Sequence, residues 1–168
     1  MKKIIFLILS GTLLLSTYLQ AQDKKFHSVF IYNFTKYIEW PSAYNSGDFI
    51  IGVLGKSDIT QNLQEMANMK TVGKQKMVVK VFNSVNEIGK CNMLFIPTSQ
   101  SDQIGLVKSR LSNSATLIIS EKNGLGRKGS GINFVVENGR WRFELNRSVV
   151  ENQNLKVSSE LDKLAIVI

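Results

Sequence analysis

The stretch GLGRKGSGINFVVENGRWRFELNR, residues 124–147, decides the fold of this chain because it contains a β-hairpin whose register is set locally. Two segments that alternate apolar and polar residues flank Asn138-Gly139. Asn-Gly is the dipeptide favoured in a two-residue type I′ turn, because both turn residues need a positive φ. Such a turn pairs Glu137 with Arg140 and Phe134 with Phe143.

The hairpin is predicted to have one apolar face and one polar face, since side chains alternate along a strand. The apolar face would pack on a core and holds Ile132, Phe134, Val136, Trp141, Phe143 and Leu145. The opposite face holds Asn133, Val135, Glu137, Arg140, Arg142 and Glu144. We interpret this second face as a charged surface, in which Glu144 is held by cross-strand pairing with Asn133.

The glycine-rich start of the stretch has the glycine spacing of a dinucleotide-binding motif but not the structural context that the motif needs. Residues 124–129, GLGRKG, satisfy G-x-G-x-x-G, but that fingerprint needs its glycines to open a helix, and here a strand is predicted to follow. The outer glycines also have P-loop spacing, with Ser130 in place of the lysine. Two interpretations stay open: a plain connection between strands, or an anion-binding nest completed by Arg127 and Lys128.

Outside the hairpin, apolar runs and helical patterns alternate along the chain. The sequence predicts buried strands over 48–54, 76–82, 92–96 and 115–120. It predicts helices over 59–69, 102–111, 146–152 and 158–163, with Asn146 as a cap. This alternation indicates a single α/β domain with a mostly parallel central sheet flanked by helices, extended by the C-terminal antiparallel hairpin.

An aromatic stripe marks the first helix of this domain. Phe26, Phe30, Phe34 and Ile38 recur every four residues and predict an amphipathic helix over 24–39. Trp40-Pro41 would end it, because a residue before proline is pushed out of the helical region. His27, on the flank of this helix and without an acidic or cysteine neighbour, is interpreted as a surface residue.

The N-terminus predicts export. Lys2-Lys3, the apolar segments 4–9 and 13–15, and Leu19-Gln20-Ala21 have the order of a secretory signal peptide, with cleavage after Ala21. The apolar run is shorter than the about 20 residues of a spanning helix. We therefore expect a signal peptide over 1–21, one domain over 22–168, and no membrane span after cleavage.

Composition excludes several classes of function. The formal net charge is +8, but the lysines and arginines are scattered, and Trp141 is predicted on the core side, so no nucleic-acid surface is expected. One histidine and one cysteine offer no catalytic triad, metal site or cofactor motif. Cys91 has no intramolecular disulfide partner and is predicted to be a small buried core residue. The sequence therefore does not indicate an enzyme.

Taken together, several blocks of the chain resemble the YfiR-like (also HmsC-like) family of exported bacterial proteins. They are FHSVFIYNFTKYIEWP (26–41), IGVLGKSD (51–58), CNMLFIP (91–97), GSGINFVVENGRWRFELN (129–146) and KVSSELDKLA (156–165). The resemblance implies a periplasmic α/β protein that does no chemistry. It also implies binding to the periplasmic part of an inner-membrane diguanylate cyclase, with release raising cyclic di-GMP and promoting biofilm formation.

The resemblance further implies that some members are dimers and that some bind small molecules. This chain departs from the family at one place. Members often carry a disulfide whose first cysteine precedes V-L-G, and here Gly52 fills that position while Cys91 matches the second cysteine. The bond cannot form, so redox control of that kind is not expected.

Two hypotheses about function follow. The first is a periplasmic regulator that binds the extracytoplasmic domain of a membrane signalling protein. Its contact residues would be Tyr32, Tyr37, Trp40, Arg140, Arg142 and Glu144. The second is a small-ligand carrier or sensor whose site lies at the carboxyl ends of the parallel strands. Its residues would be Gly55, Lys56, Ser57 and Arg127.

Overall fold

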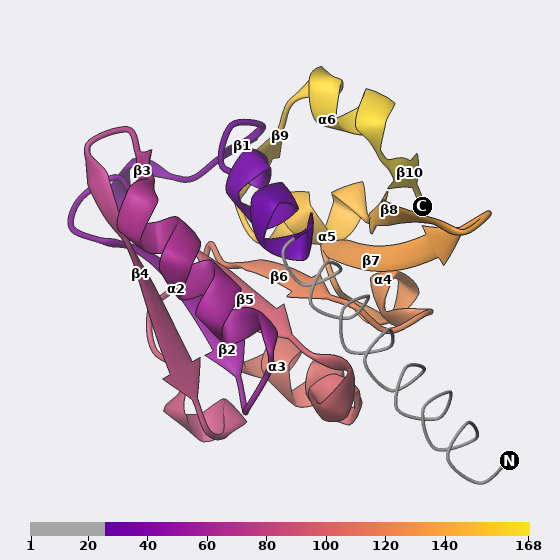
Figure 1. Cartoon of the computed structure of the whole chain (residues 1–168), viewed down its shortest axis with the longest axis horizontal. Coiled ribbons are helices and arrows are strands. Elements are labelled where there is room, and N and C mark those ends of the chain that lie inside the picture. Colours follow the sequence, from indigo (N-terminus) through magenta and orange to yellow (C-terminus); the bar gives the residue numbers. More distant parts are fainter. Residues whose placement is uncertain (1–25) are drawn as a thin grey trace, which may run out of the picture.

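An eight-stranded sheet forms the centre of the computed structural model, which describes residues 26–168. The predicted signal peptide and its cleavage site lie outside the described residues. In spatial order the strands are β10 (Ile166–Val167), β8 (Arg140–Leu145), β7 (Ile132–Glu137), β6 (Leu117–Ser120), β5 (Met93–Ile96), β2 (Phe49–Leu54), β4 (Gln75–Phe82) and β3 (Thr71–Val72) (Figure 1). A separate antiparallel pair joins β1 (Ile38–Glu39) to β9 (Lys156–Val157).

The pairing of these strands confirms the predicted fold class. Strands β4, β2, β5, β6 and β7 are mutually parallel neighbours, and β7 and β8 form the antiparallel extension. The hairpin register is the predicted one, with Phe134 opposite Phe143 and Glu137 opposite Arg140. Asn138 and Gly139 have φ of 51° and 72°, as the type I′ turn requires.

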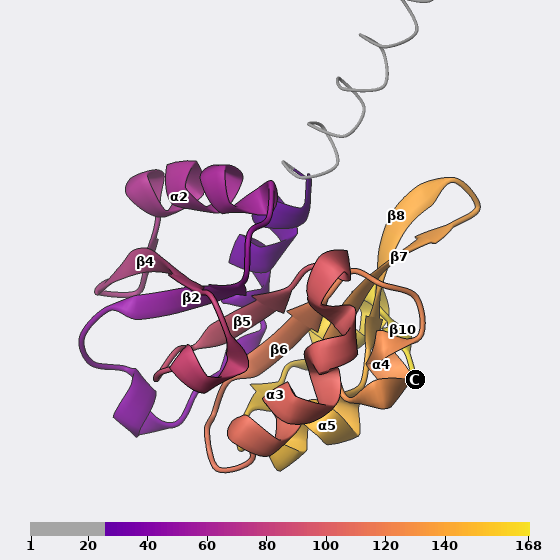
Figure 2. The ribbon, with the colours of Figure 1, turned by 90° about the horizontal axis from the view of Figure 1, so that it is seen from below.

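Helices cover both faces of the sheet (Figure 2). A helix over residues 26–34 and α2 (Ile59–Met69) lie on one face, and α3 (Ile104–Arg110) and α4 (Leu125–Lys128) lie on the other. The remaining helices are α5 (Arg147–Asn152), α6 (Ser159–Leu164) and the short 3-10 turns η1 (Ser42–Tyr44), η2 (Val85–Glu87) and η3 (Thr98–Gln103). Two apolar cores result, one on each side of the sheet. Within residues 26–168, none of the helices has both the length and the apolar character needed to span a bilayer.

The first helix is shorter than predicted. It ends at residue 34, residues 35–37 form a turn, and Ile38 lies in β1. The reason is a long-range pairing: Ile38 is opposite Val157, and the Ser158 N–H donates to the Tyr37 carbonyl at 2.9 Å. Ile38 is still buried, so the apolar pattern identified a core residue and misassigned its backbone.

Two further segments differ from their predicted form. Residues 98–103 form η3, so the helix predicted over 102–111 begins at Ile104. The glycine-rich segment contains the single turn α4 between Gly124 (φ 83°) and Gly129 (φ 125°). A strand still follows it at Ile132, so the segment does not lead into the long helix of a dinucleotide fingerprint.

The exposure of two hairpin side chains, one near the tip and one near the sheet, differs from the prediction. Val136, predicted to face the core, is 56% exposed because the hairpin tip projects beyond the helices (Figure 2). Asn133, predicted on the charged surface, is fully buried, and its side-chain amide accepts from the Ser120 hydroxyl at 2.7 Å. Its Nδ2 donates to Glu144 Oε2 at 2.9 Å, which confirms the predicted cross-strand pairing.

Candidate functional site

A cluster of aromatic rings joins the first helix to the hairpin. Phe34 lies against Phe143 with ring centroids 5.1 Å apart, and Phe30 lies 6.0 Å from the same ring. Phe134 completes the cluster at 6.0 Å from Phe34. The two contacts with Phe143 are edge-to-face, and such contacts add to simple burial, so the helix is held on the hairpin with a defined orientation.

Beside this cluster the surface opens into a groove of about 250 Å³. It lies between the helix over 26–34, the turn after it, β8 and α6. Its lining residues are Phe30, Asn33, Phe34, Tyr37, Trp141, Arg142, Phe143, Leu161 and Leu164. We call this site the aromatic groove. Its outer wall includes Leu164, which is 52% exposed.

The aromatic groove is apolar, with polar groups at its rim. Arg142 is exposed, and its Nη1 donates to Glu137 Oε2 at 3.3 Å, a pair in which both side chains are more than 40% exposed. An exposed pair of this kind is weak, so Arg142 is available to exchange Glu137 for another carboxylate. Asn33 accepts from Lys36 Nζ at 3.0 Å on the helix side.

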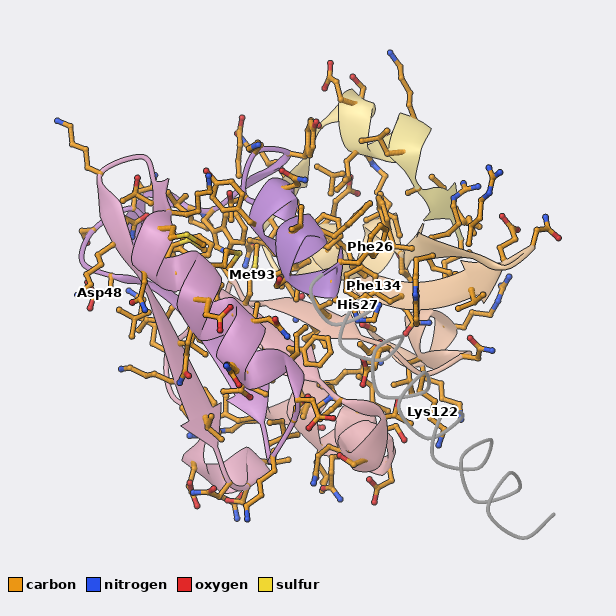
Figure 3. All side chains as sticks on the ribbon, in the orientation of Figure 1. Phe26, His27, Asp48, Met93, Lys122 and Phe134 are labelled. Carbon is orange, nitrogen blue, oxygen red and sulfur yellow. The ribbon has the colours of Figure 1, made fainter. Side chains whose placement is uncertain are left out.

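The histidine predicted to lie on the surface is instead fully buried. His27 stacks on Phe134 with ring centroids 4.1 Å apart (Figure 3). It meets Trp141 edge-on at 4.4 Å. Its Nδ1 lies 3.5 Å from Glu121 Oε2, at the carboxyl end of β6. The prediction was wrong because the groups that cover His27 come from residues about a hundred positions further along the chain. No pattern around residue 27 indicates them.

Of the six predicted contact residues, the structure brings Tyr37 and Arg142 together in the aromatic groove. Tyr32 faces a different hollow beside α2, with Lys36 Nζ and Lys70 Nζ at 5.0 and 5.6 Å from its ring. Arg140 is exposed near the hairpin tip.

The other two predicted contact residues have internal roles. Trp40 donates its Nε1–H to the Asn92 carbonyl at 3.0 Å and packs edge-on against Phe49. Glu144 is half-buried beside Asn133. Substituting Trp40 would therefore disturb the fold as well as any interface, and Arg142 is the better probe of binding.

The predicted ligand residues lie at two separate places. Gly55, Lys56 and Ser57 follow β2 at the carboxyl edge of the sheet. Arg127 is on α4, which precedes β7, and β5 and β6 lie between β2 and β7. The Gly55 N–H, expected to serve as a ligand donor, donates to the Phe82 carbonyl at 2.8 Å. Across residues 26–168, histidine, cysteine and acidic residues form no group of three or more that could hold a metal ion.

Cys91 is fully buried, as predicted. Burial raises the pKa of its thiol to about 12, with opposing contributions from a hydrogen bond to Thr116 and from the charge of Lys80. An unfolded cysteine has a pKa of about 8.5. The folded state therefore holds the proton more tightly. This contribution to stability is complete below pH about 8.5 and is lost as pH rises toward about 12.

We expect the native protein at pH 8 to react with a thiol-specific reagent at least about 100-fold more slowly than the protein in concentrated urea, because only the thiolate is nucleophilic. Absorbance of the released chromophore measures both rates, and Cys91→Ala provides the blank. Stoichiometric labelling of the native protein within minutes would contradict the burial of Cys91.

Comparison with known proteins identifies one family. The family model described as YfiR/HmsC-like matches residues 24–166, which is nearly the whole chain. No curated protein matches the chain closely enough to count as a relative. The family is a non-enzymatic, regulatory one, and it is known for periplasmic regulators of diguanylate cyclases.

Proposed function

The chain belongs to the YfiR/HmsC-like family, and from this membership we propose that it binds the extracytoplasmic part of an inner-membrane diguanylate cyclase. Binding would take place in the periplasm and hold the cyclase inactive. Release would raise cyclic di-GMP and promote biofilm formation. Family membership supports the regulatory role.

The aromatic groove is the observation that supports a protein partner most directly. Tyr, Trp and Arg carry a large share of the binding energy in protein interfaces, and Tyr37, Trp141 and Arg142 all line this groove. Its inner wall is already packed, since Phe34 and Phe143 are nearly fully buried. The groove is therefore largely formed before binding, which reduces the entropy lost when a partner docks.

The dimensions and charge of the aromatic groove indicate what would enter it. A space of about 250 Å³ admits one or two apolar side chains of a partner. Arg142 at the rim would exchange its exposed contact with Glu137 for a carboxylate of the partner. We therefore expect the cyclase segment to present a leucine-like or aromatic side chain next to an acidic residue.

One observation also favours the second candidate, a small-ligand sensor. The spatial order β4, β2, β5, β6, β7 changes direction between β2 and β5. In open α/β sheets the crevice at the carboxyl ends of such a pair is the usual ligand site. Gly55, Lys56 and Ser57 follow β2 at that point. Arg127 lies on α4, which follows β6, and β5 separates β6 from β2.

The first test is a titration of the purified protein with the extracytoplasmic domain of an inner-membrane diguanylate cyclase from the same organism. We expect saturable heat and a Kd on the order of micromolar or tighter. Sedimentation of the protein alone would show whether it forms a homodimer before binding. No heat and no change in sedimentation would contradict the proposed partner. A stabilisation of several degrees by one small compound would then favour the ligand sensor.

A further inference from the structure

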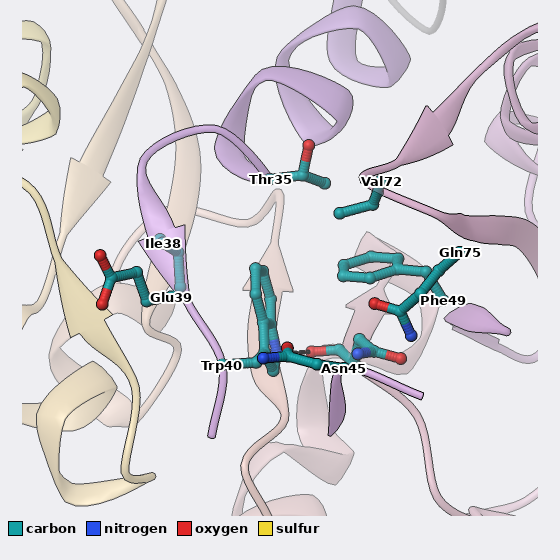
Figure 4. Close-up of a pocket in the computed structure, with 9 residues that line it drawn as sticks. Thr35, Ile38, Glu39, Trp40, Asn45, Phe49, Val72 and Gln75 are labelled. Atoms are coloured by element: carbon teal, nitrogen blue, oxygen red, sulfur yellow. Dashed lines mark hydrogen bonds between the residues drawn. The ribbon is translucent and has the colours of Figure 1, made fainter. Parts of the chain in front are cut away.

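A second pocket, of about 270 Å³, lies at the amino-terminal edge of the sheet, opposite to the edge where α/β proteins usually bind ligands. Phe49 opens β2, Gln75 opens β4, and Asn92 directly precedes β5. The indole of Trp40 forms one wall of this pocket (Figure 4). The other lining residues are Thr35, Ile38, Glu39, Asn45 and Val72.

Two nearly buried side-chain amides face this pocket, and hydrogen bonds fix which way each one points. Asn92, 4% exposed, accepts from the Ile50 N–H through Oδ1 at 2.9 Å. Gln75, 9% exposed, donates its Nε2–H to the Tyr44 and Gly47 carbonyls at 3.0 and 3.2 Å. Reversing either amide would place like groups against each other, so the orientations are determined.

Each amide therefore uses one end for the fold and keeps the other end unbonded. Within residues 26–168, no hydrogen bond reaches Asn92 Nδ2 or Gln75 Oε1. Neither atom is among the fully enclosed polar atoms without a partner, so each keeps some accessible surface, and both residues line the pocket. Figure 4 shows the Gln75 amide beside Phe49, at the side of the pocket across from Trp40. The pocket thus offers one donor and one acceptor next to an aromatic wall.

We propose that this amino-edge pocket binds a small, flat, neutral carboxamide whose amide group is attached to a ring. The N–H of the ligand would donate to Gln75 Oε1, its carbonyl would accept from Asn92 Nδ2, and its ring would pack on Trp40. This site is separate from the aromatic groove and does not depend on the proposed cyclase partner.

The same geometry disfavours charged ligands. A carboxylate has no proton to donate to Gln75 Oε1, and an ammonium group cannot accept from Asn92 Nδ2. In either case one nearly buried amide end loses water without gaining a partner. The lining residues include no lysine or arginine, and the carboxylate of Glu39 points away from the indole (Figure 4).

The indole of Trp40 provides the signal for a test. The chain has two tryptophans, so Trp141→Phe assigns the Trp40 indole N–H peak in a ¹H–¹⁵N spectrum. We expect benzamide to shift this peak in a saturable way. Benzoate and benzylammonium should bind about tenfold or more weakly, because each leaves one amide unpaired. Equal binding of the three probes, or no saturable shift with benzamide because the pocket holds only water, would overturn the proposal.

Asn92→Asp provides the sharper variant. It keeps an oxygen to accept from the Ile50 N–H and replaces the free donor by a carboxylate oxygen. We expect benzamide to lose about tenfold in affinity and benzylammonium to become the preferred probe. Asn68→Asp, exposed on α2, adds the same charge outside the pocket and should change neither.

A third variant covers the case in which Asn92→Asp does not fold. Val72→Phe enlarges a half-buried side chain that lines the pocket, and it should abolish benzamide binding by occupying the space. Unchanged benzamide affinity in folded Val72→Phe would overturn the proposed location.

Discussion

Phe134→Ala is expected to lower the free energy of unfolding by about 3–5 kcal/mol, the usual range for truncating a fully buried aromatic ring. Phe134 has no exposed surface and lies at the centre of the aromatic cluster. It stacks on His27 and contacts Phe34 and Phe30 at ring-centroid distances of 6.0 and 6.4 Å. Its removal would leave a cavity between the first helix and the hairpin.

Urea denaturation followed by circular dichroism measures this change. Val136→Ala is the matched control, since it lies two residues further along the same strand with its side chain 56% exposed. Its effect should stay within about 0.5 kcal/mol. A loss below about 1 kcal/mol for Phe134→Ala would mean that the helix is not anchored on the hairpin through this ring.

Leu164→Asp is expected to weaken binding to the cyclase domain by roughly 30-fold or more, equivalent to about 2 kcal/mol. Leu164 is exposed in the unbound protein and lines the aromatic groove, so a carboxylate there costs little in the free state. In a complex that fills the groove, the same carboxylate would lose its water without a partner.

Calorimetry with the cyclase domain measures the affinity, and Leu106→Asp is the control. Leu106 is 61% exposed on α3, away from the aromatic groove, so the same substitution should leave the affinity unchanged. Equal losses for the two variants would point to a general charge effect. Unchanged affinity for Leu164→Asp would move the contact surface away from the groove.

Prediction from sequence succeeded where structure depends on near neighbours. The helix α2 spans Ile59–Met69, the predicted range, because its apolar positions repeat at the helical period. The Asn146 side chain caps α5 by accepting from the Val149 N–H, as predicted. Both features depend on residues a few positions apart.

Prediction failed where distant segments meet. His27 gives no local signal of burial, since Phe134, Trp141 and Glu121 cover it from other parts of the chain. The candidate site also combines features that the local sequence indicates with features that only contacts between distant segments decide. Tyr37 and Arg142 are predicted contact residues on the basis of residue type alone, and their meeting in one groove depends on how helix 26–34 packs against β8.

The sequence by itself determined the hairpin register and the alternation of helices with parallel strands, because both are encoded by short-range periodicity and turn chemistry. Tertiary structure alone decided where the first helix ends, which amide ends face the amino-edge pocket and which aromatic rings form the groove. Those features arise from contacts between segments far apart in the chain. Their free energy depends on burial and hydrogen bonding that exist only after the sheet has assembled.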